Sequence, residues 1–88
     1  MIRIERIDDE NYRVTVQGDV TTQHEVSVSA SYCEKLTGGH VSPEILIERS
    51  FQFLLERESN RSILNRFDLP VIGQYFPEYE STIRGRLG

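Results

Sequence analysis

The most informative segment of this chain is SPEILIERSFQFLLERE, residues 42–58. It opens with Ser42 and Pro43, which are favoured at a helix N-cap and at the first helical position, and Glu44 suits the positive end of the helix dipole. The residues that follow repeat at helical spacing, so that one wide face is apolar. That face carries Leu46, Ile47, Phe51, Phe53, Leu54 and Leu55. We therefore predict a helix from about Pro43 to Glu58.

The first 32 residues alternate apolar and polar side chains, which is the period of half-buried β-strands. The runs are Ile2–Glu5, Tyr12–Gln17 and Glu25–Ala30, the last extending towards Tyr32. Asp8-Asp9-Glu10-Asn11 between the first two runs has the composition of a turn. We predict an antiparallel meander whose apolar face meets the helix and whose other face stays polar. The polar face would carry Arg3, Glu5, Arg13, Thr15, Gln17, Ser27 and Ser29.

Beyond the long helix, capping residues and prolines predict short helical pieces. Ser59 would cap a piece ending near Phe67, Asp68 would cap Leu69–Ile72, and Pro77 either kinks the last helix or begins a new one. Gly38-Gly39 separates the two halves as a loop. The predicted fold is one α+β domain over residues 1–88, with a β-meander at 1–32 and a helical part at 42–84. In it, a three-stranded antiparallel meander packs against one long helix, with short C-terminal helices.

Composition narrows the class of protein. A chain of 88 residues has room for one hydrophobic core. The net charge of −4 disfavours binding to nucleic acid, which usually requires a basic surface. The single cysteine permits no intramolecular disulfide, and we find no secretory signal and no apolar run approaching the ~20 residues of a membrane helix. We expect a cytoplasmic protein without a membrane partner.

Chemistry-bearing residues are few and scattered. Cys33, His24 and His40 lack the paired spacings of a zinc site, so we interpret them as a buried thiol and two surface histidines. Glu34 would raise the pKa of the Cys33 thiol and so oppose its use as a nucleophile. The acidic run at residues 8–10 is interpreted as a solvated turn. We therefore expect no catalytic residue, no metal and no cofactor.

The segment FDLPVIGQYFPEY, residues 67–79, holds four of the eight aromatic residues, with three arginines just upstream. Tyrosine and arginine are enriched in interface hot spots, and aromatic rings beside arginines can also stack on exposed bases. The same rings could instead close a small core, with Phe67, Ile72, Phe76 and Tyr79 pointing inward. The candidate partner-binding residues are Arg57, Arg61, Arg66, Tyr75 and Tyr79.

Residues 42–80 are similar to a family of small bacterial proteins for which no activity is known. The resemblance lies in FLLERE (53–58), SIL (62–64), FDL (67–69) and YFPEYE (75–80), and it implies no function. The strand order and the helix that starts at Ser42 also resemble, more loosely, the partial-RNase-H-like domain of HicB-type antitoxins. The Pro-Gly-Cys turn that marks those antitoxins is missing, so no residue role is carried over.

Three functional hypotheses follow. The first is a non-catalytic protein-interaction or regulatory module. Its partner would be an unknown protein or a second copy of the chain in a homo-oligomer. The second is an antitoxin-like regulator that contacts nucleic acid through Arg57, Arg61 and Arg66. The third is an enzyme or small-ligand binder without a recognisable motif.

Overall fold

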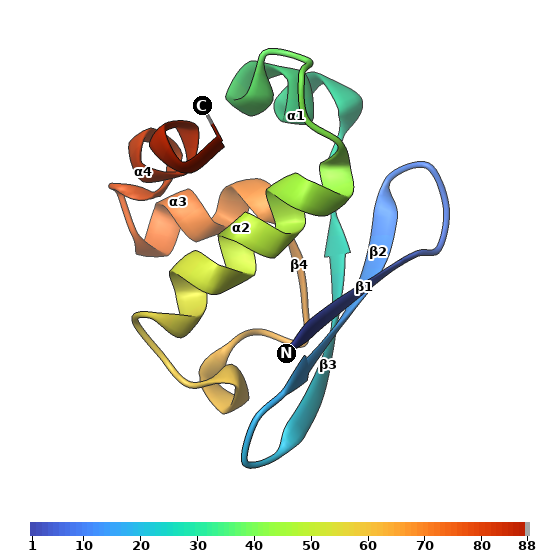
Figure 1. Ribbon diagram of the computed structural model, residues 1–88, viewed down its shortest axis with the longest axis vertical. Coiled ribbons are helices and arrows are strands. Elements are labelled where there is room, and N and C mark those ends of the chain that lie inside the picture. The colour runs from blue at the N-terminus through green and yellow to red at the C-terminus, as the bar shows by residue number, and fades with distance from the viewer. Residues whose placement is uncertain (88) are drawn as a thin grey trace.

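The computed structural model describes residues 1–87, which form an α+β fold (Figure 1). Its strands are β1 (Ile2–Arg6), β2 (Asn11–Gln17), β3 (Thr21–Ser27) and β4 (Arg66–Asp68). Its helices are α1 (Ala30–Thr37), α2 (Pro43–Leu55), α3 (Ile72–Tyr75) and α4 (Tyr79–Leu87), with short 3-10 turns η1 (Asn60–Ser62) and η2 (Leu69–Val71). The predicted α+β class is confirmed, and β4 and α1 are additional elements that were not predicted.

The strands form one mixed sheet in the order β1-β2-β3-β4 within residues 1–87. The first three are antiparallel, as in the predicted meander, whereas β4 pairs in parallel with β3 and sets Phe67 opposite Val26. The prediction of a purely antiparallel three-stranded sheet was therefore wrong. A period-two pattern does not reveal β4, because the strand has only three residues. The chain reaches it through α1 and α2, since a parallel pair needs a long crossover.

Residues that were predicted to extend the third strand begin helix α1 instead. The Ser29 hydroxyl accepts a hydrogen bond from the Tyr32 backbone N–H at 3.1 Å and caps this helix. Gly38 ends the helix with φ of 70°, a left-handed conformation that favours glycine. The strand itself starts at Thr21 and stops at Ser27. The alternation was misleading because Val28 is buried although it lies beyond the strand.

Helix α2 begins as predicted and lies across the apolar face of the sheet (Figure 1). The Ser42 hydroxyl accepts a hydrogen bond from the Ile45 N–H at 3.3 Å, which is the predicted N-cap. The helix ends at Leu55, before the predicted end at Glu58. The chain turns after Leu55, and the Leu54 carbonyl accepts backbone hydrogen bonds from the residues of this turn. Its buried residues share one core with the strands: Leu46, Ile47, Phe51, Phe53 and Leu54 with Tyr12, Val14, Val16 and Val26.

The C-terminal residues form the predicted short helices beside α2. The piece expected from Ser59 to Phe67 is only the turn η1, after which the chain extends into β4. Asp68 precedes η2, but its side chain makes no capping hydrogen bond. Pro77 lies before α4, so a new helix begins there rather than a kink. Helix α4 packs on α2.

The face of the sheet away from α2 is polar, as predicted. Glu5, Arg13, Glu25 and Arg66 stand in register across the strands and alternate in charge. Such cross-strand pairs of opposite charge favour this register. No helix within residues 1–87 has the length and apolar character that crossing a membrane would require.

Candidate functional site

The predicted partner-binding residues lie in different environments, and Tyr79 belongs to the core. It is 0% exposed, its ring packs against Phe53 at 5.4 Å between centroids, and its hydroxyl bonds the Ser50 hydroxyl at 2.6 Å. Burial raises the pKa of this phenol well above its usual value. Tyr79 cannot contact a partner in the folded protein, so this part of the predicted site was wrong. The alternative prediction, that Tyr79 closes the core, is confirmed.

Arg57 is also occupied within the molecule. Its guanidinium lies 3.6 Å from the centre of the Phe53 ring, a cation–π distance. The same group donates hydrogen bonds to the Phe53 carbonyl at 3.1 Å and to the Glu78 carboxylate at 3.3 Å. Arg57 therefore joins the end of α2 to the loop before α4 rather than presenting a free cation.

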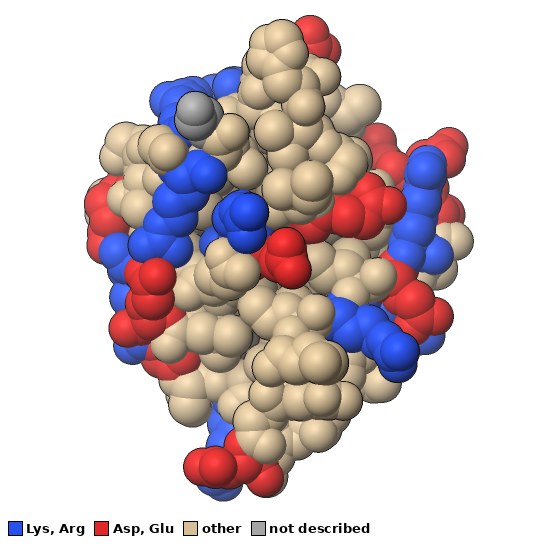
Figure 2. All heavy atoms as spheres, in the orientation of Figure 1, with Lys and Arg blue, Asp and Glu red and all other residues tan. Residues whose placement is uncertain are grey.

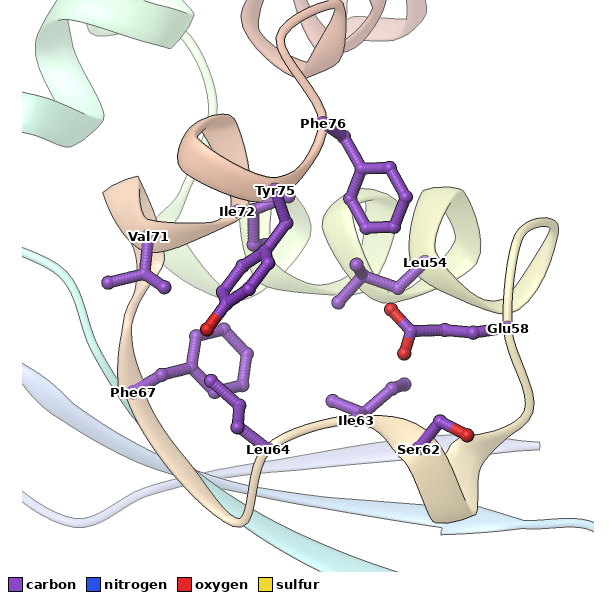
Figure 3. Close-up of a pocket in the computed structure, with 10 residues that line it drawn as sticks. All are labelled: Leu54, Glu58, Ser62, Ile63, Leu64, Phe67, Val71, Ile72, Tyr75 and Phe76. Atoms are coloured by element: carbon purple, nitrogen blue, oxygen red, sulfur yellow. The ribbon is translucent and has the colours of Figure 1, made fainter.

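Tyr75 is the most exposed of the predicted aromatic residues, and it overhangs an apolar pocket (Figure 3). The ring is 65% exposed, and neighbouring Leu64 is 47% exposed. The pocket has a volume of about 290 Å³. It lies between the end of α2, the segment from η1 to β4, and α3. Its lining residues are Leu54, Glu58, Ser62, Ile63, Leu64, Phe67, Val71, Ile72, Tyr75 and Phe76.

A buried polar network fixes the segment that forms one wall of this pocket. His24 bonds the Leu64 carbonyl through Nδ1 at 2.8 Å and the Thr22 hydroxyl through Nε2 at 2.8 Å. A carbonyl only accepts, so Nδ1 carries the proton and Nε2 accepts from the hydroxyl when the ring is neutral. Asn60 donates to the Thr22 hydroxyl at 3.1 Å and to the Val20 carbonyl at 2.9 Å. The network holds this wall against the β2–β3 hairpin.

The same network corrects one prediction and explains the exposure of Leu64. His24 is only 2% exposed, so its interpretation as a surface histidine was wrong, whereas His40 is exposed as expected. With the Leu64 carbonyl held inward and Ile63 buried, the Leu64 side chain is left pointing to the mouth of the pocket. No sequence pattern links His24 to a residue so far along the chain.

One carboxylate enters the pocket. Glu58 follows α2, and its carboxylate points towards the apolar lining (Figure 3). Across the part of the chain that the structure describes, no basic side chain pairs with it. An incoming group that is apolar with a cation beside it would therefore match the pocket better than an anion.

A second hollow lies on the other side of β4, over the polar face of the sheet. Its charged lining residues are Asp8, Glu25, Arg66 and Asp68, and Ile7, Asn11 and Ser27 also line it. Arg66 pairs with Glu25 at 2.6 Å, and the Ser27 hydroxyl donates a hydrogen bond to Asp68. Leu64, Phe67 and Val71 line both this hollow and the apolar pocket. The two sites therefore flank one strand.

The remaining predicted arginine, Arg61, lies exposed on η1 and lines neither hollow. On the face of the molecule seen in Figure 2, basic side chains gather at the upper left, and basic and acidic side chains are interspersed elsewhere. Arg57 and Arg66 each have a carboxylate partner. The arginines thus do not combine into one cationic surface.

Cys33 and the side chains that could hold a metal ion are separated. Cys33 is buried, as predicted, and this burial raises the pKa of its thiol. Within residues 1–87, no three histidine, cysteine or acidic side chains gather closely enough to hold a metal ion.

No family model matches this chain, and no curated protein or solved structure is significantly similar to it. A function must therefore be inferred from the chain's own residues.

Proposed function

We propose that this chain is a non-catalytic protein-interaction module that binds its partner at the apolar pocket beside β4. The observation that carries the proposal is the exposure of Tyr75 and Leu64 at the mouth of that pocket. Large apolar side chains that border a concave apolar lining are typical of sites where another molecule covers them. We place this module in the cytoplasm, as its single cysteine suggests.

The size of the pocket supports a side chain or short segment as occupant. Pockets for drug-sized ligands span about 300–1,000 Å³, and this one, at about 290 Å³, lies just below that range. Tyrosine is over-represented among hot-spot residues because it combines apolar area with one polar group. Tyr75 has this character, and the buried residues behind it would give a bound side chain a rigid apolar floor.

The polar groups of the pocket support binding rather than catalysis. Glu58, Ser62 and Tyr75 supply polar atoms, and neither a histidine nor a cysteine belongs to the lining. A nucleophile needs an adjacent base, and none of these groups forms such a pair. Nucleic acid is also a weaker candidate than protein, because Glu78 and Glu25 partly neutralise Arg57 and Arg66.

Affinity capture from bacterial lysate, with and without nuclease, tests this proposal. The tagged wild type should retain a stoichiometric protein partner after nuclease treatment. The Tyr75→Ala and Leu64→Gln variants should lose it. The matched control is Val20→Thr, which alters a similarly exposed apolar residue on the β2–β3 hairpin, outside the pocket, and should behave like wild type. Equal capture by all the variants would contradict the proposal, and loss of every partner with nuclease would favour nucleic acid.

A further inference from the structure

Strand β4 is the last strand of the sheet, so one of its backbone edges is unpaired within residues 1–87, and this edge adjoins both hollows. The Asn65 carbonyl accepts a hydrogen bond from the Glu25 N–H at 2.7 Å, so Asn65 and Phe67 direct their backbone groups towards β3. Successive residues of a strand direct these groups to opposite sides. The N–H groups of Arg66 and Asp68 and the carbonyl of Arg66 therefore point away from the sheet, where an added strand could bond them.

The two hollows adjoin β4 on opposite faces of the sheet. Those side chains would alternate between the two faces of the sheet, about 4.8 Å from β4. On the inner face they would meet the apolar pocket beside Phe67. On the outer face they would lie beside Arg66 and Asp68, which also line the outer hollow. The opposite sheet edge differs, because neither hollow is lined by a residue of β1.

Charge defines the chemistry of the occupant. The outer hollow holds three carboxylates, Asp8, Glu25 and Asp68, and one guanidinium, Arg66, which is already paired with Glu25. The inner pocket adds the Glu58 carboxylate. Both sides of β4 therefore favour a cationic segment, with an apolar side chain at the position that faces inward.

We propose that the partner contributes an extended segment that pairs with the free edge of β4, placing an apolar side chain in the pocket and basic side chains before and after it beside the outer hollow. This inference rests on the proposed function and adds the conformation and the chemistry of the bound segment. Main-chain hydrogen bonds supply affinity in this mode, and alternate side chains supply specificity. A second copy of the chain fits less well, since two chains of net charge −4 repel.

A phage-displayed library of random heptapeptides, panned against the full chain, provides the probe. The enriched sequences should carry an apolar residue with lysine or arginine on both sides. When a synthetic peptide of the selected sequence binds, the amides of Arg66 and Asp68 should exchange with solvent at least ~10-fold more slowly. The amide of Phe67, already bonded to β3, should change little and serves as the internal control.

A matched pair of substitutions separates backbone pairing from side-chain contact. Arg66→Pro removes an N–H that β3 does not use, as an edge strand tolerates, and should weaken peptide binding at least ~10-fold. Arg66→Ala keeps that N–H and removes the cation, so binding of a basic peptide should be equal or stronger. Should the proline variant fail to fold, the amide exchange of the wild type decides the question.

The outcomes distinguish this inference from the proposed function. Strand addition would be overturned by enriched peptides whose apolar residues recur at helical spacing. It would also be overturned if peptide binding left the Arg66 and Asp68 amides of the protein unprotected. The interaction module would stand as long as Tyr75→Ala still abolished peptide binding. Binding unaffected by Tyr75→Ala would overturn both. The proposed occupant would be overturned if the library showed no enrichment. It would also be overturned if the protein sedimented as a dimer and its Arg66 amide were protected without peptide.

Discussion

At the residue scale, Asp8 organises the turn between β1 and β2. Its carboxylate accepts hydrogen bonds from the backbone N–H groups of Glu10 and Asn11, both at 3.0 Å, and from the Asn11 side chain. These bonds favour the ionised form and hold the pKa of Asp8 below its usual value of 3.8. Asp8, which was interpreted from the sequence only as part of a solvated acidic turn, therefore stabilises the hairpin.

The lowered pKa of Asp8 predicts a pH-dependent contribution to stability. A group whose folded pKa is depressed stabilises the fold above its unfolded pKa, and this contribution is lost as the pH falls through the folded pKa. The Asp8→Ala variant should therefore be less stable than wild type near pH 7, and the difference should shrink below about pH 4. Urea unfolding of both proteins across this range measures it. A difference that grows on acidification would contradict the account.

Tyr79 and Tyr75 form a matched pair of tyrosines, one buried and one exposed. We expect Tyr79→Ala to cost about 3–5 kcal/mol through the cavity it leaves. Tyr79→Phe should cost about 1 kcal/mol, because the hydrogen bond to Ser50 is lost. Tyr75→Ala should change the free energy of unfolding by less than about 0.5 kcal/mol. Chemical denaturation of the variants checks the ranking, and a large loss for Tyr75→Ala would assign that ring to the core.

At the element scale, Arg57 and the His24 network position the elements around the pocket. Arg57 stacks on Phe53 and bonds Glu78, which ties the end of α2 to the start of α4. His24 and Asn60 tie the segment before β4 to the β2–β3 hairpin. Each contact joins elements that are distant in sequence, so the pocket depends on tertiary rather than local structure.

The loss of Arg57 should destabilise the protein while the loss of Arg61 should not. Arg57→Ala removes the cation–π contact with Phe53 and should lower the free energy of unfolding by about 1 kcal/mol. Arg61 is exposed, so Arg61→Ala serves as the matched control with an expected change under about 0.5 kcal/mol. Thermal unfolding of the two variants compares them. Equal melting temperatures would contradict the structural role of Arg57.

Removing Asn60 should disturb the pocket wall as well as stability. Asn60→Ala would leave the Val20 carbonyl and the Thr22 hydroxyl without this donor, which should cost about 1–3 kcal/mol. The wall that carries Leu64 should then loosen and partner binding should weaken. Hydrogen exchange of the amides at residues 60–65 reports the change. Unaltered exchange there would show that the network does not hold the wall.

Sequence patterns predicted some of the helices and strands correctly and missed others. The N-cap at Ser42, the alternation of β2 and the turn at residues 8–11 are local signals, and each was found where expected. Helix α1 was missed because apolar alternation continued through Val28 into its first turn, and Ser29 and Gly38, which cap it, were assigned to the third strand and to a loop. Strand β4 is too short for any periodicity, and only its pairing with β3 defines it.

At the scale of the whole molecule, the candidate site was only partly predictable. The segment at residues 67–79 was identified as important, and Tyr75 does lie at an apolar pocket. Composition could not separate Tyr75 from Tyr79, because only the placement of α3 and α4 on α2 exposes one ring and buries the other. Nor could it reveal Leu64 or Glu58, whose roles depend on the course of the chain from η1 to β4.

The apolar pocket and the end of the polar face both lie at the β4 edge of the sheet. Helix α2 covers the apolar face and, with α3 and the segment before β4, forms the apolar pocket at that edge. The polar face ends at the same strand with Arg66 and Asp68. A partner at β4 would contact both layers of the fold at once. The central claim of the proposed function is that this partner binds at the apolar pocket.

The most direct test of this claim is the dissociation constant of the captured partner for wild type and for Tyr75→Ala, measured by titration calorimetry. Because Tyr75 lies at the mouth of the pocket and its ring is 65% exposed, the variant should bind about 30-fold more weakly, which corresponds to a hot-spot loss of about 2 kcal/mol. A Tyr75→Ala protein that is folded and binds with the affinity of wild type would contradict the claim.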